Sequence, residues 1–211
     1  FNAEYIIDLN NDVFINDPLF IKKILRIHSK TNFDVLGPDI YCQTSLQHQS
    51  PLRLKGISKK ELKFYHKSLE KVNRFFEFYY YKNRLLDKLH LSKSSNTSDI
   101  QHVPYNQTLL NPVLYGACYI FSRNFINKRK YAFNPATFMF FEEEILQYEC
   151  LQKNLKIIYS PEAQVIHLDD IVTNLIYKKH KSNHLKEKNK RREILKSVYV
   201  LMNLINSNEK D

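Results

Sequence analysis

Apolar residues follow two different spacings along the first part of the chain. The run Glu4–Leu9 predicts a buried strand. Asp17-Pro18 is typical of a helix N-cap followed by proline, and the apolar spacing after it predicts a helix to about Ile27. Asp34–Leu36 predicts a short strand that ends at Gly37-Pro38. This alternation of strand and helix favours a layered α/β domain.

The pattern changes between Pro51 and about Ser95, where lysine residues alternate with leucine, phenylalanine and tyrosine. This spacing predicts one or two basic amphipathic helices that end in the polar linker Ser92–Ser98. A helical insertion with a solvated face explains the segment. The alternative is attraction to anionic lipid or to an acidic glycan.

The α/β pattern returns with a predicted strand at Leu114–Ser122, in which Gly116-Ala117 is small enough for close backbone approach. A helix is predicted from Glu142 to about Leu151. Two short strands, Lys156–Tyr159 and Gln164–His167, are predicted to flank a turn at Ser160-Pro161-Glu162.

Beyond Asp170 the chain becomes basic, with a heavily charged run at Lys178–Arg192 and an apolar stripe after it. We therefore expect one domain at residues 1–170, interrupted by the helical insertion at about 51–100, and a basic amphipathic helical tail at 171–211. The 211 residues, 43% of them hydrophobic, suffice for one domain with a core.

Charge and cysteine content narrow the function classes. The net charge of +10 fits an anionic partner: a nucleotide diphosphate, nucleic acid or the inner membrane surface. Cys42, Cys118 and Cys150 lack metal-type spacing, and their odd number favours buried, reduced thiols in a cytosolic protein over a nucleophile. No run approaches the roughly 18–20 apolar residues of a membrane span. Because the chain begins with Phe1, we expect an upstream part.

Three polar groups stand at the ends of predicted elements. Asn10-Asn11-Asp12 follows the first strand, and ligands in open α/β sheets bind at the carboxyl ends of strands. A hard oxygen ligand there can hold a divalent cation against a diphosphate, although the same residues suit a plain turn. The acidic cluster Glu142-Glu143-Glu144 and the strand-end His167 add weight. Their alternatives are helix-dipole stabilisation and a hydrogen-bonded structural histidine.

Four segments carry a family resemblance: Asp8–Val13, Tyr115–Ser122, Thr137–Leu146 and Tyr159–His167. In order and spacing they resemble the C-terminal half of family-two glycosyltransferases of the rhamnosyltransferase and capsular-polysaccharide type. The resemblance covers roughly residues 1–40 and 110–175. It implies a partial GT-A-like, Rossmann-like mixed sheet flanked by helices.

The resemblance also implies an activity. Such an enzyme transfers a sugar from a nucleoside-diphosphate sugar to a saccharide or lipid-linked acceptor, with inversion and with Mg²⁺ or Mn²⁺. It acts in bacterial surface polysaccharide synthesis in the cytoplasm, with peripheral contact with the anionic inner membrane face, and needs no nucleic acid. The donor base is recognised by the N-terminal half, which this chain lacks, so activity of the chain by itself is not implied.

The resemblance assigns roles to the metal and diphosphate residues. Asp12 is the expected direct metal ligand. Asn10, where the family often has aspartate, contributes to the metal or donor site through its amide oxygen or through water. His167 completes the metal or diphosphate site, and Arg123 is a weaker candidate for phosphate contact, with a surface salt bridge as its alternative. Tyr115 is a further weak candidate.

The acidic cluster supplies the expected catalytic residues. Glu143 aligns with the family's usual aspartate and is the expected general base, whereas Glu142 orients the acceptor or accepts hydrogen bonds from backbone N–H groups. Consecutive helical residues lie about 100° apart, so Glu144 is expected to face solvent. The rings of Phe138–Phe141 fit either a sugar-stacking wall or the core. Asp169 and Asp170 are expected to cap the tail helix rather than to touch the acceptor.

Two other functions remain open on the sequence. A nucleic-acid-binding module would explain the net charge, the basic run Lys186–Arg192 and the aromatic residues among lysines at Phe75–Tyr81. A non-catalytic scaffold domain would explain Asn10 and the missing N-terminal half.

Overall fold

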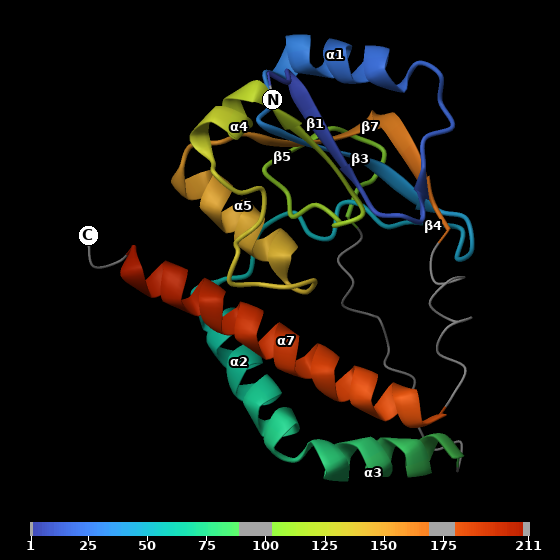
Figure 1. Ribbon diagram of the computed structural model, residues 1–211, viewed down its shortest axis with the longest axis vertical. Helices are drawn as coiled ribbons and strands as arrows, with labels where there is room; N and C mark the ends of the chain where they lie inside the picture. The colour runs from blue at the N-terminus through green and yellow to red at the C-terminus, as the bar shows by residue number, and fades with distance from the viewer. Residues whose placement is uncertain (1, 89–102, 169–179, 209–211) are drawn as a thin grey trace. The chain divides into compact units, whose positions relative to one another are not determined.

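The computed structural model describes residues 2–88, 103–168 and 180–208. The chain forms two compact units (Figure 1). The sheet unit comprises Phe1–Gly56, His102–Pro135 and Glu142–Ile171. The helical unit comprises Ile57–Gln101, Ala136–Phe141 and Val172–Asp211, so the predicted insertion and the predicted tail belong to the same unit. The predicted linker and the predicted caps at Asp169 and Asp170 lie outside the described residues.

The sheet unit contains a mixed sheet of seven strands in the order β1-β6-β3-β7-β2, with β4 paired to β3 and β5 paired to β7. Strands β3 and β7 are parallel, whereas β1 and β3 are both antiparallel to β6. This confirms the predicted α/β class with a mixed sheet. The strands are β1 Tyr5–Leu9, β2 Val13–Phe14, β3 Val35–Cys42, β4 Gln47–His48, β5 Leu109–Leu110, β6 Cys118–Ser122 and β7 Ile157–His167.

Helices cover both faces of this sheet: α1 (Phe20–Thr31) on one face, and α4 (Arg123–Lys128) with α5 (Glu142–Gln152) on the other. Two separate apolar clusters show the layering. Leu36 packs in the cluster that contains the buried residues of α1, whereas its neighbour Val35 packs in the cluster that contains residues of α4 and α5. Successive side chains of a strand point to opposite faces, so the two layers share one sheet.

The helical unit contains α2 (Lys59–Arg74), α3 (Phe76–Lys88) and α7 (His180–Ser207). One or two amphipathic helices were predicted for this segment, and the structure has two, with the break at Phe75. Helix α2 begins with a capping box in which the Ser58 hydroxyl accepts from the Glu61 amide, while the Glu61 carboxylate accepts from the Ser58 amide. The apolar stripe of the predicted tail lies on α7, where Val198 and Leu201 are buried.

The predicted ends of two strands are wrong, and both errors have the same cause. Strand β3 runs through Gly37-Pro38, and β7 is a single strand through the predicted turn. Pro38 lies opposite Ser160 and Asp39 opposite Gln164, so three residues of β7 form a bulge between them. A proline cannot donate a ladder hydrogen bond, and a bulge in the partner strand accommodates it.

Other predicted boundaries shift by a few residues. Helix α1 begins at Phe20 rather than next to Asp17, whose carboxylate accepts from the Leu19 amide (2.8 Å) in the turn that precedes the helix. It continues to Thr31 and ends with Asn32 in the left-handed conformation (φ 49°). Strand β1 is half exposed rather than buried because it pairs only with β6. Strand β6 starts four residues later than predicted.

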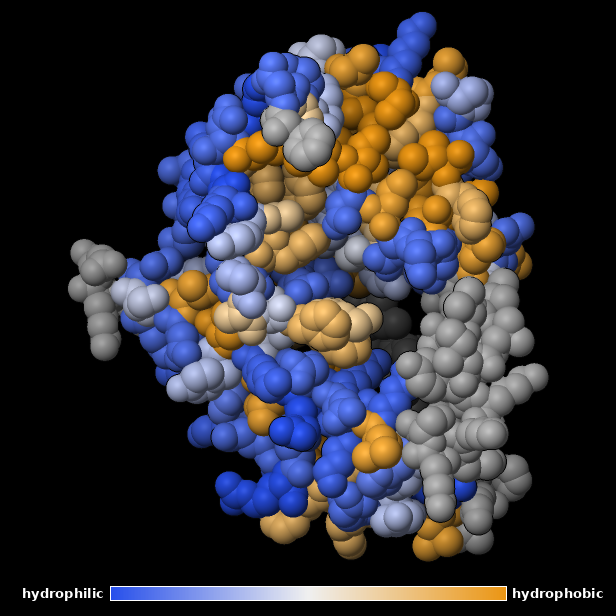
Figure 2. All heavy atoms as spheres, viewed as in Figure 1, coloured by the Kyte–Doolittle hydropathy of each residue, from blue (hydrophilic) through white to orange (hydrophobic). Residues whose placement is uncertain are grey.

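The surfaces of the two units differ in character. Exposed apolar side chains gather over β1, β2, the segment that leads into α1 and the first turns of α1 (Figure 2). They are Ile6, Leu9, Phe14, Ile15, Leu19, Ile21 and Leu25. By sequence, the helical unit carries 20 Lys and Arg against 9 Asp and Glu, a net charge of +11, whereas the sheet unit carries 12 against 13, a net charge of −1. Among the described helices, none is long and apolar enough to cross a membrane.

Candidate active site

One edge of the sheet collects the polar residues that the sequence singles out. Strands β1, β3 and β7 run in the same direction, so their carboxyl ends share this edge with the amino end of β6. The turn at residues 10–12 links β1 to β2 along it. The Asn10 amide donates to the Ala117 carbonyl (3.0 Å), and three residues later Val13 pairs with His167. Asp12 therefore lies at the carboxyl ends of strands, as the sequence predicts.

Asp12 and His167 face each other at this edge. His167 Nε2 lies 3.3 Å from Asp12 Oδ1, and the His167 side chain is buried. His167 Nδ1 lies 2.7 Å from Gln49 Oε1. When Nδ1 donates to that oxygen, the Nε2 of a neutral ring presents its lone pair to Asp12. Asp12 Oδ1 is itself buried and accepts no hydrogen bond from the described residues. Its contact with Nε2 is an ion pair when the ring is protonated, and with a neutral ring two electron-pair donors lie next to each other.

A chain of contacts leads from this pair to Glu143. The Tyr115 and His167 rings lie 6.0 Å apart between centroids. The next residue, Gly116, has the Glu143 carboxylate against its backbone, and a Cβ on Gly116 would lie 2.6 Å from Glu143 Oε1. The predicted need for a small residue is thus explained, and the approaching group is a carboxylate. The structure brings Asp12, His167, Tyr115 and Glu143 to the same edge of the sheet.

Glu143 lies in the first turn of α5 and is partly buried. Burial raises the pKa of this carboxyl above its ordinary value, and the neighbouring Glu142 and Glu144 add to the rise, while a backbone hydrogen bond opposes it. A carboxylate with a raised pKa is a stronger base, and a general base works best when its pKa lies nearer the working pH.

Tyr119 extends the acidic environment into the sheet. Its ring is fully buried, and its hydroxyl has no hydrogen-bond partner among the residues that the structure describes. Burial raises the pKa of Tyr119 well above its ordinary value, and the charges of Glu143 and Asp8 raise it further. Asp8 lies opposite Tyr119 in the pairing of β1 with β6. The phenol therefore stays protonated near these carboxylates.

The prediction for Glu144 is wrong. Its side chain is buried, with 6% of the residue exposed, and it forms an ion pair with Arg53. The reason is its position on α5, because Glu144 begins the buried face that Ile145 and Leu146 continue. A buried carboxylate requires a paired cation, and Arg53 supplies it. Glu142 is partly buried beside Glu143.

The segment before α5 has an unusual backbone. Met139 and Phe141 have φ angles of 67° and 66°, the left-handed region that bulky side chains rarely adopt. Such strain concentrates at functional sites. The side chain of Phe138 is exposed, whereas Phe140 lies under the Lys190 ammonium and Phe141 stacks on Tyr65 within the helical unit. A sugar-stacking role for these rings stays a prediction.

Arg123 does not join the site. It follows β6 at the opposite edge of the sheet, because Ser122 pairs with Tyr5 while Cys118 pairs with Leu9. There its guanidinium donates to Asn2 Oδ1 (2.6 Å) and pairs with Glu4 (3.1 Å). This is the surface ion pair that the sequence left as the alternative to phosphate contact.

A second polar cluster was not predicted. Asp39 is buried and accepts from His48 Nδ1 (2.8 Å) and from Gln164 Nε2 (2.7 Å). The Tyr105 ring stacks on His48 at 3.7 Å between centroids. The cluster joins β3, β4, β7 and the segment before β5. No local pattern links these residues, because the pairing of the strands alone brings them together.

The three cysteines fit the structural interpretation. Cys42, Cys118 and Cys150 are buried thiols. Burial raises the pKa of Cys150 to about 12 and raises that of Cys118 as well. A thiol that stays protonated near neutral pH is a poor nucleophile, so the side chains of Cys118 and Cys150 serve packing.

The residues present can be tested against the divalent cation that the resemblance implies. In the part of the chain that the structure describes, no three His, Cys, Asp or Glu side chains form a metal cage. Mg²⁺ at diphosphate sites needs only one or two protein ligands, since waters and phosphate oxygens complete its shell. Adjacent ligands of an octahedral ion at about 2.1 Å lie roughly 3 Å apart. Asp12 Oδ1 and His167 Nε2, at 3.3 Å, fit that requirement.

Comparisons of the chain with protein-family models, with curated proteins and with solved structures each find no match. The chemistry of the residues at the sheet edge is therefore the basis for assigning a function.

Proposed function

We propose that the protein is a metal-dependent glycosyltransferase with a GT-A-like sheet unit. It transfers a sugar from a nucleoside-diphosphate sugar to a hydroxyl of a saccharide or lipid-linked acceptor. On this proposal it contributes to bacterial surface polysaccharide synthesis at the cytoplasmic face of the membrane. The observation that carries the proposal is the buried Asp12 Oδ1, which accepts no hydrogen bond from the described residues and lies 3.3 Å from His167 Nε2.

Asp12 and His167 are the residues that would hold Mg²⁺ or Mn²⁺, and Asn10 is the candidate for a further contact through its amide or through water. A divalent cation bound there supplies the positive charge that stabilises a departing diphosphate. The hydrogen bond between His167 and Gln49 fixes the orientation of the ring. Such contacts by the second nitrogen of a metal-binding histidine strengthen the ligand.

Glu143 is the proposed general base. Its carboxylate accepts the proton of the acceptor hydroxyl while that oxygen attacks the anomeric carbon of the donor. The bond from this carbon to the diphosphate oxygen breaks, and its electron pair leaves with the diphosphate. The raised pKa of Glu143, caused by burial and by its acidic neighbours, suits this role. Gly116 leaves the space in which the carboxylate lies.

The proposal is tested by turnover with a matched pair of variants. The wild-type protein is incubated with Mn²⁺, a saccharide or lipid acceptor and a panel of UDP-, GDP- and dTDP-sugars, and released nucleoside diphosphate is measured. Glu143→Gln should reduce turnover by about 10²-fold or more, the usual contribution of a general base. Glu162→Gln makes the same chemical change at an exposed residue of the same unit and should leave turnover unchanged.

Turnover that survives Glu143→Gln would contradict the assignment of the base. A protein that binds donor with Mn²⁺ but never releases diphosphate would support the scaffold alternative instead.

A further inference from the structure

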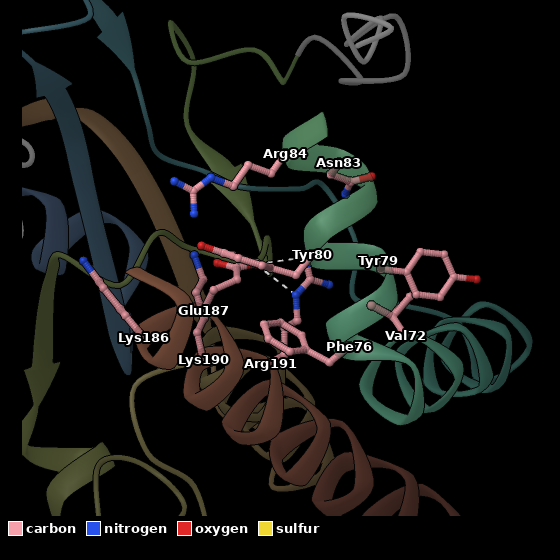
Figure 3. A pocket seen from close by; sticks show the side chains of 10 residues that line it. All are labelled: Val72, Phe76, Tyr79, Tyr80, Asn83, Arg84, Lys186, Glu187, Lys190 and Arg191. Atoms are coloured by element: carbon pink, nitrogen blue, oxygen red, sulfur yellow. Dashed lines mark hydrogen bonds and ion pairs between the residues drawn. The ribbon is translucent and has the colours of Figure 1, made fainter. Parts of the chain in front are cut away.

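The helical unit contains a hollow that the proposed transfer reaction does not use. It lies between α3 and α7 and has a volume of about 650 Å³ (Figure 3). Ligand sites in proteins commonly measure roughly 300–1,000 Å³. The hollow is thus large enough for a small ligand or a headgroup rather than for a single water or ion.

Four of the ten residues that line the hollow are cationic. Arg84 comes from α3, and Lys186, Lys190 and Arg191 come from α7. The wall contains one carboxylate, that of Glu187, and it is held by Arg191 through Nε (2.9 Å) and Nη2 (2.8 Å). Arg84, Lys186 and Lys190 leave the wall with a net positive charge. The whole helical unit has a net charge of +11.

Contacts beside the hollow hold its two helices together. The Glu77 carboxylate of α3 pairs with His184 (2.7 Å) and Lys188 (2.8 Å) of α7. The buried Phe76 ring packs on the His184 ring, with 5.2 Å between centroids, and Lys188 lies over its face. These contacts of Phe76, Glu77, His184 and Lys188 therefore help to set the spacing between α3 and α7.

The wall favours phosphate over other anions. A phosphate group offers several acceptor oxygens, and it is bound bidentately by guanidinium groups and as a point charge by ammonium groups. Figure 3 shows the Arg84 and Lys190 side chains on the same side of the hollow, with Tyr80 nearby. A ring beside the cations gives an apolar surface for the part of the ligand that carries the phosphate.

The arrangement is less suited to single-stranded nucleic acid. Binding of that kind uses a series of exposed rings along a basic groove. In Figure 3 the Tyr79 side chain points away from the cations, so the rings of α3 do not form a continuous stacking surface on this side.

We propose that this hollow binds the phosphate group of a phosphorylated ligand, either a soluble compound or the headgroup of an anionic lipid. The site is independent of the proposed transferase reaction, because all its residues belong to the helical unit. Phosphate is the shared chemistry of the two sources, and the experiment separates them.

The test compares two double variants that each remove two positive charges from the helical unit. Arg84→Gln/Lys190→Gln changes the hollow, whereas Lys60→Gln/Lys67→Gln changes exposed lysines of α2 that do not line it. Binding is measured by calorimetry with inorganic pyrophosphate and by co-sedimentation with phosphatidylcholine vesicles that contain phosphatidylglycerol. EDTA is present throughout, so that metal-dependent diphosphate binding at Asp12 does not contribute.

The hollow variant should bind about tenfold or more weakly, and the α2 variant should lose less than threefold, because two cations in direct contact matter more than two distant ones. Pyrophosphate binding without vesicle binding assigns a soluble ligand. Vesicle binding that pyrophosphate displaces assigns a lipid headgroup. Both results support the proposal.

Three results would overturn it: equal losses in the two variants, no binding of either probe, or a preference for a single-stranded oligonucleotide that both variants weaken alike. A measurement on the unaltered protein guards against misfolding of the variants. Pyrophosphate should protect Lys190 from acetylation and leave Lys60 reactive, and equal labelling of the two lysines would also contradict the proposal.

Discussion

The two units of this protein divide its charge and its chemistry between them. The sheet unit is almost neutral, at −1, and its polar residues are concentrated at one sheet edge around Asp12, His167 and Glu143. The helical unit carries +11 and a basic hollow. The net charge of +10 for the whole chain therefore comes from the helical unit. It gives no information about the ligand of the site at the sheet edge.

Substitutions at the two sites should therefore have independent effects. Variants at the sheet edge should change turnover and metal binding and leave phosphate binding in EDTA unaffected, while variants of the hollow should do the opposite.

The largest effect on stability is expected at Asp39. Replacing it with Asn removes a buried carboxylate that accepts hydrogen bonds from His48 and Gln164. The new amide group places a hydrogen-bond donor next to the donors of these two side chains. Asp39→Asn should reduce the free energy of unfolding by about 2–3 kcal/mol, measured by urea denaturation. Asp17→Asn makes the same change in the turn before α1 and should move the midpoint much less. An unchanged midpoint for Asp39→Asn would contradict the role of this cluster.

Gly116→Ala should reduce turnover by about tenfold, a change of roughly 1.4 kcal/mol in the barrier. The added Cβ would lie 2.6 Å from Glu143 Oε1 and displace the carboxylate. Because a glutamate side chain can rotate, stability should change much less than activity. The shorter Glu143→Asp in the Gly116→Ala background should recover part of the loss. Wild-type turnover in the single variant would show that the position of Glu143 is unimportant.

The pH profile of turnover should reveal the raised pKa of Glu143. The base is active when ionised, so activity should fall as the pH drops through this raised pKa, and the midpoint should lie above that of an ordinary glutamate. Burial is the main cause, and the charge of Glu142 adds to it. Glu142→Gln should move the acid limb to lower pH. A limb that moves to higher pH in this variant would contradict the electrostatic account.

The smallest effect is a stabilisation. A carboxyl whose pKa is raised in the folded state contributes stability below its unfolded pKa and loses that contribution as the pH rises through the folded pKa. Glu143→Gln removes the ionised, desolvated group, so it should raise the free energy of unfolding by about 0.5–1 kcal/mol at pH 7. The difference between variant and wild type should shrink toward pH 4. A less stable variant at pH 7 would indicate that the carboxylate is favourably paired.

Local sequence patterns were sufficient to predict much of the fold. The apolar spacing predicted α2, α3 and α5, and the alternation of elements predicted the α/β class. The ends of β3 and β7 were missed because the proline signal of Pro38 and Pro161 is local, whereas the bulge that accommodates it depends on the pairing of two strands far apart in sequence. Turn-forming residues inside a paired strand are therefore mistaken for the end of that strand.

The candidate site shows the same limit. Asp12 and His167 could be placed because each ends a strand-like run, and the carboxyl ends of parallel strands meet at one edge. The environment of Glu144 was predicted wrongly, and the role of Arg123 was left open. Their partners, Arg53 and Glu4, lie about 90 or more residues away along the chain, so no local pattern shows them. The left-handed backbone at Met139 and Phe141 has no sequence signal either, because neither residue type favours it.

The central claim is that Asp12 and His167 share one cation at the sheet edge. Titration of the protein with Mn²⁺, followed by electron paramagnetic resonance of the free ion, tests it without any substrate. Asp12→Asn should weaken Mn²⁺ binding by about 10–100-fold, the scale of losing a charged contact at a metal site, while Asp17→Asn should bind like wild type. Equal Mn²⁺ affinity in Asp12→Asn and wild type would contradict the claim.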